Sequence, residues 1–394
     1  MKRPGDGIAV AATIPAFVCR YRVWPWDVSA TDEWNAPRVC RSLHRRVSVR
    51  DGLAFAAVEL RTVPRVARRA GRELVRRARV EADWLASRRG RADWALFHEF
   101  APPPSGGGHQ FLRALQRELG ERGLEVEQNR ISAGTRACLF NSFNFDFARL
   151  KRFARADARM VHRVDGPIGV YRGFDDGTDR LIAEVNRELA HATVLQSRYS
   201  ADKHAELGLV LKEPVVIPNT VDPAIFNPPA EREPLDDRPL RLIASSWSDN
   251  RRKGAETLAW LDRYLDWTRF EMTFVGRAPT TFDRIRVVGP VGSEGVAELL
   301  RHHDVYVAAS RDDPCSNALL EALACGLPAA FLASGGHPEL VGEAGLPFHE
   351  DEELPEVLDR LFADLDNYRA AISVPALADV ADRYLQVLGF SPGR

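Results

Sequence analysis

From residue 93 onward, short apolar runs alternate with stretches in which apolar residues recur at helical spacing. The run Asp93–Phe100 predicts a compact strand, and His109–Arg122 shows the three- and four-residue steps of a helix that ends at Gly123. Further strands are predicted at Leu124–Gln128, Ala137–Phe143, Met160–Val164, Ala192–Gln196 and Val215–Pro218. This alternation predicts a parallel sheet with helices on both faces.

The alternation breaks at Asn227–Pro239, where four prolines and six charged residues permit no regular element. A second series of the same design follows. Its predicted strands and helices are Leu240–Ser245, Glu256–Leu265, Phe270–Val275, Ile285–Val288, Gly295–His302, Val305–Ala309, Asn317–Leu323, Ala329–Phe331 and Leu354–Asp364. We therefore expect two doubly wound α/β domains, residues 93–230 and 231–378, and a final segment, 379–394, that carries a helix.

Residues 1–92 form a basic N-terminal extension whose fold the pattern does not define. After Pro64 the apolar residues take helical spacing, at Ala67, Ala70, Leu74, Ala78 and Leu85. Arginines cover the other faces, at positions 65, 68, 69, 72, 76, 77 and 79. Such a basic amphipathic helix is typical of segments that lie on an anionic membrane surface. The alternative is a solvated helix packed on the rest of the chain, since alanines give a weak apolar face.

The formal net charge of −1 conceals a strong asymmetry. Residues 1–92 hold 20 Lys+Arg and 9 Asp+Glu, a net of +11, so the remainder holds 34 and 46, a net of −12. A basic head on an acidic body indicates an anionic partner, or docking of the head on the body. A nucleic-acid partner is disfavoured, because the basic segment lacks regularly spaced aromatic residues and the body is acidic.

The five cysteines are scattered and form no CxxC pair. This pattern excludes a disulfide framework or a zinc ribbon and favours a reducing compartment. No apolar run approaches the length of a membrane span. We expect a cytoplasmic protein, with peripheral contact at the inner membrane face left open for the basic segment.

Two doubly wound domains place the carboxyl ends of their strands across a cleft, where ligands bind. The loop Gly106–Gly107–Gly108 lies between a strand and a helix, and its backbone amides can approach an anion without Cβ interference. It is not a GxGxxG motif, and Asn129 rather than an acid follows the next strand, so a dinucleotide site is poorly supported. A flexible turn is the alternative for this glycine run.

In the second domain, Ser316 or Asn317 can cap a helix that follows a strand. The start of that helix offers free N–H groups and a positive dipole end to a phosphate. Asp313 lies just outside the helix and Glu321 within it, an arrangement that can grip two parts of one ligand. An aspartate that complements the helix dipole and a solvated glutamate are the alternative.

Lys253 stands beside two arginines, Arg251 and Arg252, in the loop after the strand Leu240–Ser245. Lysine is scarce in this chain, occurring only at positions 2, 151, 203, 212 and 253. Positive charge at this place can stabilise a diphosphate as it departs.

Several segments of the second domain together resemble family-4 (group 1) retaining glycosyltransferases. In chain order they are Lys253–Gly254, Phe274–Val275–Gly276, Asp304–Val305–Tyr306–Val307, Asp313-x7-Glu321, Ala324–Cys325–Gly326–Leu327–Pro328 and Gly335–Gly336–His337–Pro338–Glu339. The first domain is similar to the same enzymes more loosely, at Gly106–Gln110, His162–Gly166, Gln196–Ser197 and Ile217–Asp222. The resemblance covers about 93–345 and the C-terminal helix Val380–Leu388.

The resemblance implies the α/β GT-B fold, in which two doubly wound Rossmann-like domains face a cleft. Residues 93–230 would be the acceptor side and 231–378 the donor domain, the C-terminal helix would pack back on the first domain, and the Arg-rich extension would be extra. The implied activity is transfer of a sugar from a nucleoside diphosphate to an acceptor hydroxyl, with retention of configuration. The acceptor could be a lipid-linked saccharide, another glycan such as a polysaccharide, or a small metabolite.

The resemblance also implies roles for single residues. Glu321 would hold the ribose, and Lys253 with helix amides the diphosphate. Three side chains would be catalytic, Asp313, Lys253 and His162, with His162 facing the sugar or acceptor. The donor-binding set is Glu321, Arg252, Ser316, Asn317, Ala318, Leu319, Gly106, Gly107 and Gly108. Retention by front-side attack requires no nucleophile, metal or cofactor, so we expect none.

Two positions depart from the family pattern. Asp313 stands where a glutamate is usual, and Ser246–Trp247–Ser248 occupies the stretch where an arginine usually precedes the Lys–Gly pair, although Arg251 or Arg252 could substitute. The alternative function is therefore a non-catalytic nucleotide-sugar-binding or partner subunit with the same fold. A GT-B epimerase would need a second set of carboxylates, and a phosphorylase a pyridoxal lysine, for which Lys253 is badly placed.

Overall fold

The computed structural model describes residues 71–102, 106–143, 145–235, 238–248 and 250–391. The predictions made for residues 1–70 lie outside this range. The strands and helices from Trp94 onward belong to one compact unit, Arg72–Arg394. Among the described residues, none of the helices has the length and apolar character needed to cross a membrane.

The first domain contains a six-stranded parallel sheet. In spatial order its strands are β2 (Val126–Gln128), β1 (Trp94–Phe97), β3 (Ala137–Asn141), β4 (Arg159–Val164), β5 (Ala192–Leu195) and β6 (Pro214–Val216). Its helices are α2 (Gly107–Glu121), α3 (Phe147–Phe153), α4 (Ile168–Arg172), α5 (Thr178–Leu189) and α6 (Arg198–Glu206). The strands predicted from the apolar runs are confirmed, each to within a few residues.

Both faces of this sheet are buried. Alternate residues of a strand point to opposite faces, so each strand contributes side chains to two cores. Trp94 and Leu96 of β1 belong to the core beneath α2, whereas Ala95 and Phe97 belong to the core beneath α3. This two-sided burial explains why the strands are continuous apolar runs in the sequence.

The second domain contains another six-stranded parallel sheet. Its strands in spatial order are β12 (Gly345–Phe348), β11 (Ala329–Leu332), β10 (Val305–Ala308), β7 (Leu240–Ser246), β8 (Phe270–Gly276) and β9 (Arg286–Val288). Its helices are α7 (Ala255–Tyr264), α8 (Ser293–Arg301), α9 (Asn317–Ala324), α10 (His337–Val341), α11 (Leu354–Ala363) and α12 (Leu365–Ala370). The second α/β series is confirmed.

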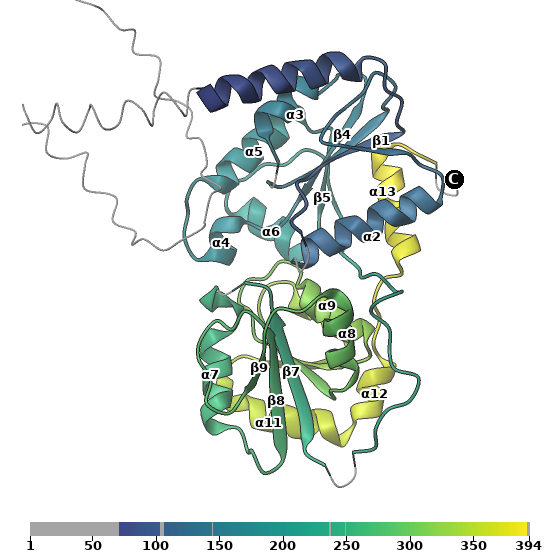
Figure 1. Ribbon diagram of the computed structural model, residues 1–394. Helices are drawn as coiled ribbons and strands as arrows, with labels where there is room; N and C mark the ends of the chain where they lie inside the picture. Colours follow the sequence, from purple (N-terminus) through teal and green to yellow (C-terminus); the bar gives the residue numbers. More distant parts are fainter. Residues whose placement is uncertain (1–70, 103–105, 144, 236–237, 249, 392–394) are drawn as a thin grey trace, which may run out of the picture. The chain divides into compact units, whose positions relative to one another are not determined.

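The last helix, α13 (Leu377–Leu388), belongs to the core of the first domain although it follows the second in the chain. Its buried residues Val380, Tyr384 and Leu385 share a core with Trp94 and Leu96, and α13 packs against α2 (Figure 1). The chain therefore returns to the first domain in α13.

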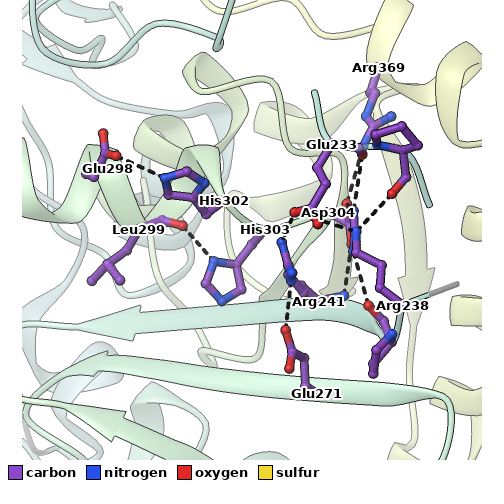
Figure 2. A network of polar contacts seen from close by, with 12 residues as sticks. Glu233, Arg238, Arg241, Glu271, Glu298, Leu299, His302, His303, Asp304 and Arg369 are labelled. Atoms are coloured by element: carbon purple, nitrogen blue, oxygen red, sulfur yellow. Dashed lines mark hydrogen bonds and ion pairs between the residues drawn. The ribbon is translucent and has the colours of Figure 1, made fainter. Parts of the chain in front are cut away.

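The irregular segment before β7 is fixed to the second domain by buried ion pairs (Figure 2). The Arg238 guanidinium donates to both carboxylate oxygens of Asp304, at 2.7 and 2.8 Å, and Asp304 also accepts from the Arg241 N–H at 2.9 Å. Asp304 is 3% exposed, so both partners must be present to offset the cost of burying its charge. The described residues of this segment, 227–235 and 238–239, form no helix or strand, as its prolines indicated.

The basic helix runs over residues 71–87, and its face toward the first domain differs from the apolar positions predicted. Val80 and Ser87 are buried, whereas Leu74 and Leu85 are exposed. Contact with the body is made largely by charge: Asp83 and Glu81 of this helix pair with Arg149 and Arg152 of α3, and the Arg152 guanidinium lies 3.5 Å from the Trp84 ring centroid. The helix does pack on the body, through Asp83, Glu81, Trp84 and Arg76, which pairs with Asp146 at the start of α3, rather than through the alanine and leucine positions.

Candidate functional site

A cavity of about 350 Å³ is lined by loops that follow the carboxyl ends of strands in both sheets. The first domain contributes the glycine loop and the residues after β3, β4 and β5, and the second contributes the residues after β7, β8 and β10. This is where doubly wound sheets bind ligands. Of the predicted site residues, the cavity collects Gly106, Gly107, Gly108, Lys253, Asp313, Ser316, Asn317, Ala318 and Glu321.

Lys253 and Asp313 form an ion pair in the second-domain wall. The Lys253 Nζ lies 2.6 Å from Asp313 Oδ2, and the two side chains are 19% and 6% exposed. Burial alone would raise the pKa of Asp313, but the Lys253 charge outweighs it and holds the pKa below its usual range. The ammonium also lies 4.7 Å from the ring centroid of Tyr171 in the first domain. Both groups are thus charged at neutral pH, within one cavity.

The backbone next to Lys253 requires glycine. Gly254 takes φ +96°, and a Cβ there would lie 2.7 Å from the Cβ of Ala309. This close approach sets the short helical turn Arg251–Lys253 against the end of β10. In the Lys253–Gly254 pair, the backbone geometry therefore requires the glycine, and the lysine supplies the charge.

The start of α9 opens on the same cavity. Ser316 is its N-cap and accepts the N–H of Leu319, and Ser316, Asn317 and Ala318 line the cavity. Leu319 is fully buried and does not line it, so its side chain is a core residue and its N–H is already bound. Its side chain therefore does not face the donor, and a donor contact through the backbone of this turn stays a prediction.

Glu321 is the one acid of α9 that lines the cavity, one turn into the helix. Burial raises the pKa of its carboxyl to about 8, with no neighbouring cation to oppose the effect. A carboxyl group that borders an open cavity and is largely protonated at neutral pH is a perturbed group of the kind that marks functional sites.

The glycine loop packs directly on the second domain. A Cβ on Gly107 would lie 2.2 Å from the Cβ of Asn317, and one on Gly106 would lie 3.3 Å from Cδ1 of Trp247. Glycine is thus needed for the amino ends of α2 and α9 to approach each other. Two helix N-termini, each a partial positive charge, meet at this end of the cavity.

Two predicted site residues lie elsewhere. His162 is fully buried within β4, where its ring stacks on Phe140 with centroids 4.3 Å apart, and burial lowers its pKa to about 3. Arg252 pairs with Asp312 and packs against Gly173, and it does not line the cavity. Both expectations are therefore corrected: one side chain points into the core, and the other is occupied by an aspartate.

Asp165, which follows β4, lines the cavity where His162 was expected to. Its Oδ1 accepts from Arg163 Nη1 at 2.9 Å and from Gln196 Nε2, and none of the described residues bonds to its Oδ2. Arg163 is 1% exposed and also donates to Asn141 and Asn219. The sequence signal existed, because Asp165 is the first residue beyond a strand end, whereas His162 lies inside the strand.

Glu339 bridges the two domains. Its carboxylate accepts the backbone N–H groups of Arg198 and Tyr199 at 2.8 and 2.7 Å, at the start of α6. Asn219 donates to Asn317 at 2.9 Å in a second bridge. Glu339 lies in α10 of the second domain and thus caps a helix of the first domain.

The part of the chain that the structure describes contains no group of three or more His, Cys, Asp or Glu side chains arranged to hold a metal ion. Its cysteines, Cys138, Cys315 and Cys325, are free and buried.

Comparison with known proteins agrees with this fold. Residues 259–364 match the model of the family described as glycosyl transferases group 1. This segment begins within α7, extends past the end of α11 and includes Asp313, α9 and Glu321. The resemblance seen in the second domain is confirmed. No curated protein matches the chain.

Solved structures of glycosyltransferases share the whole two-domain arrangement. The sucrose-phosphate synthase of Thermosynechococcus elongatus has 17% identity and a TM-score of 0.56, over 76% of this chain and 95% of that one. Anabaena Alr3699/HepE in complex with UDP-glucose has 15% identity and a TM-score of 0.52, over 75% and 96%. The catalytic domain of Arabidopsis thaliana starch synthase IV, bound to ADP and acarbose, has 11% identity and a TM-score of 0.57, over 76% and 99%. The chain has the GT-B fold.

Proposed function

We propose that this protein transfers a sugar from a nucleoside-diphosphate sugar to an acceptor hydroxyl, with retention of configuration. The observation that carries the proposal is the buried Lys253–Asp313 pair in a cavity that also receives the amino end of α9. HepE and starch synthase IV, which share the fold, were solved with UDP-glucose and ADP.

In the proposed mechanism, the diphosphate lies at the α9 N-terminus between Lys253 and the glycine loop. As the bond to the sugar breaks, negative charge grows on the leaving phosphate, and fixed N–H groups and the lysine stabilise it. Asp313 binds sugar hydroxyls and Glu321 those of the ribose. No resident metal or cofactor is part of the proposal, because the positive charge comes from the chain. A cytoplasmic location stays a prediction from the cysteine pattern.

The proposal is tested by calorimetric titration with UDP-, GDP- and ADP-sugars, followed by assay of nucleoside-diphosphate release. We expect one donor to bind and to be hydrolysed slowly, with water as the acceptor. The anomeric configuration of a transferred product, read by NMR, tests retention. Binding of no donor would contradict the proposal.

A non-catalytic binding subunit is the second candidate. It is favoured by Trp247, which stands where the resemblance places an arginine, lines the cavity and stacks with Arg277 at 4.9 Å. Donor binding without release, over long incubation and with a range of sugar acceptors, would select this candidate.

We assign Asp165 the binding of a reacting hydroxyl through its Oδ2. Its Oδ1 is held by Arg163 and Gln196, so the carboxylate is already oriented. Asp165→Asn is expected to slow nucleoside-diphosphate release about tenfold to a hundredfold, at unchanged affinity for the nucleoside diphosphate. Asp202→Asn, the same change on the exposed surface of α6, is the control. Equal rates in both variants would remove Asp165 from the mechanism.

A further inference from the structure

The helix over residues 71–87 presents a second face that the first domain does not cover. Its covered side carries Val80, Trp84 and Asp83, which pairs with Arg149. On the other side Leu74, Val75 and Leu85 are 68%, 66% and 58% exposed. They are three of the ten large apolar residues most exposed in the described part of the chain.

These exposed residues form one stripe. At about 100° per residue, Leu74, Val75 and Leu85 fall within an arc of about 120°, and the exposed alanines 78, 82 and 86 lie in the same arc. The stripe runs along the helix for several turns (Figure 1 shows the helix beside α3). An apolar strip of this width on a solvent-facing side is a docking surface rather than a scatter of single residues.

Arginines flank the stripe on both sides. Arg72 and Arg79 lie along one edge and Arg77 along the other, all three exposed, and Glu81, which pairs with Arg152, also lies on the Arg77 edge. Long arginine side chains can reach past an inserted apolar strip to the charged layer above it. An apolar centre between two cationic edges is the pattern of a helix that lies in the interface of an anionic membrane.

We propose that this face of the helix docks on an anionic lipid surface, with Leu74, Val75 and Leu85 inserted and the flanking arginines on the headgroups. A second copy of the chain fits poorly, because pairing two stripes would bring arginine edges together. The chain's own residues 1–70 also fit poorly, since they hold 13 Lys+Arg and 6 Asp+Glu, a net of +7. The same charge would instead add to attraction by an anionic surface. The inference is independent of the cavity and its chemistry.

The test is co-sedimentation of the full chain with vesicles of phosphatidylcholine alone and of phosphatidylcholine mixed with phosphatidylglycerol. We expect binding only to the mixed vesicles, weakened by added salt. The double variant Leu74→Ser/Leu85→Ser is expected to bind at least about tenfold more weakly. Leu207→Ser/Val210→Ser, which alters two residues exposed elsewhere at 50% and 83%, is the matched control and should bind as the unaltered protein does.

Each other outcome overturns the proposal. Equal binding to both vesicle types, or to neither, removes the anionic surface as the partner. If the variant Arg72→Gln/Arg79→Gln loses binding but the serine variant keeps it, the protein binds by charge alone and the apolar stripe does not insert. Sedimentation velocity that shows dimers dissociating in the serine variant would assign the face to a second copy. A thermal melt for every variant excludes loss of folding as the cause.

Discussion

Replacing Lys253 by methionine is expected to slow nucleoside-diphosphate release by roughly a hundredfold or more, because it removes a fixed cation from the leaving group. It also strands Asp313, which is 4% exposed, without its partner. Breaking a buried pair in this way costs on the order of 3–5 kcal/mol, less whatever is recovered when Asp313 takes up a proton. The measurements are the release rate at saturating donor and the thermal unfolding temperature.

A double variant separates the two effects. Lys253→Met/Asp313→Asn removes both charges, so we expect it to regain much of the lost stability while remaining inactive. Lys212→Met, at an exposed lysine, is the control for loss of a positive charge. If the double variant recovered activity together with stability, the pair would be structural and the leaving group would need another cation.

Replacing Glu321 by glutamine is expected to stabilise the free protein and to weaken donor binding. In the unfolded chain this carboxyl titrates near 4.5, whereas burial raises its pKa to about 8 in the fold. Between these values the unfolded state releases a proton that the folded state keeps. The wild-type protein therefore loses stability relative to the variant as pH rises through this window.

The expected difference is absent at acidic pH and reaches on the order of 2 kcal/mol at about pH 8, less than full burial would give because the side chain borders the cavity. Thermal unfolding of both proteins across this range checks it, with Glu184→Gln on the exposed side of α5 as the control. Donor affinity measured above about pH 8, where the Glu321 carboxyl is ionised, should fall about tenfold, since a neutral amide accepts hydroxyl donors less strongly than a carboxylate. Unchanged donor affinity would withdraw Glu321 from the ribose site.

The sequence was most informative where the chemistry lies in one continuous segment. Asp313, Ser316 and Glu321 are close along the chain, and a strand followed by a helix brings them to one cavity whatever the rest of the fold does. Lys253 could be added because its loop follows the neighbouring strand, and parallel strands end at the same edge of the sheet.

The first-domain wall could not be predicted as well, because it depends on contacts between distant segments. The predicted strand Met160–Val164 ends where β4 ends, so the spacing places Asp165 beyond the strand and His162 within it, and His162 was assigned to the site from the resemblance alone. Arg252 pairs with Asp312 and does not line the cavity, and Glu339 accepts the N–H groups at the start of α6. Only the folded chain brings these partners near.

The orientation of the basic helix depends on ion pairs that helical spacing does not reveal. Spacing identified Leu74 and Leu85 as one face, but the acids Glu81 and Asp83 meet arginines of α3 and turn that face outward. Amphipathicity predicts that a face needs a partner and leaves open which partner it finds.

The return of α13 to the first domain has a consequence for synthesis of the chain. Val380, Tyr384 and Leu388 complete a core that begins at Trp94 and includes Ile217. At ~5–20 residues per second, the ribosome needs on the order of ten seconds or more to pass from one end of the second domain to the other. Throughout that interval the nascent first domain lacks the side chains of α13, so we expect it to expose apolar surface beside α2 and to attract chaperones until α13 is made.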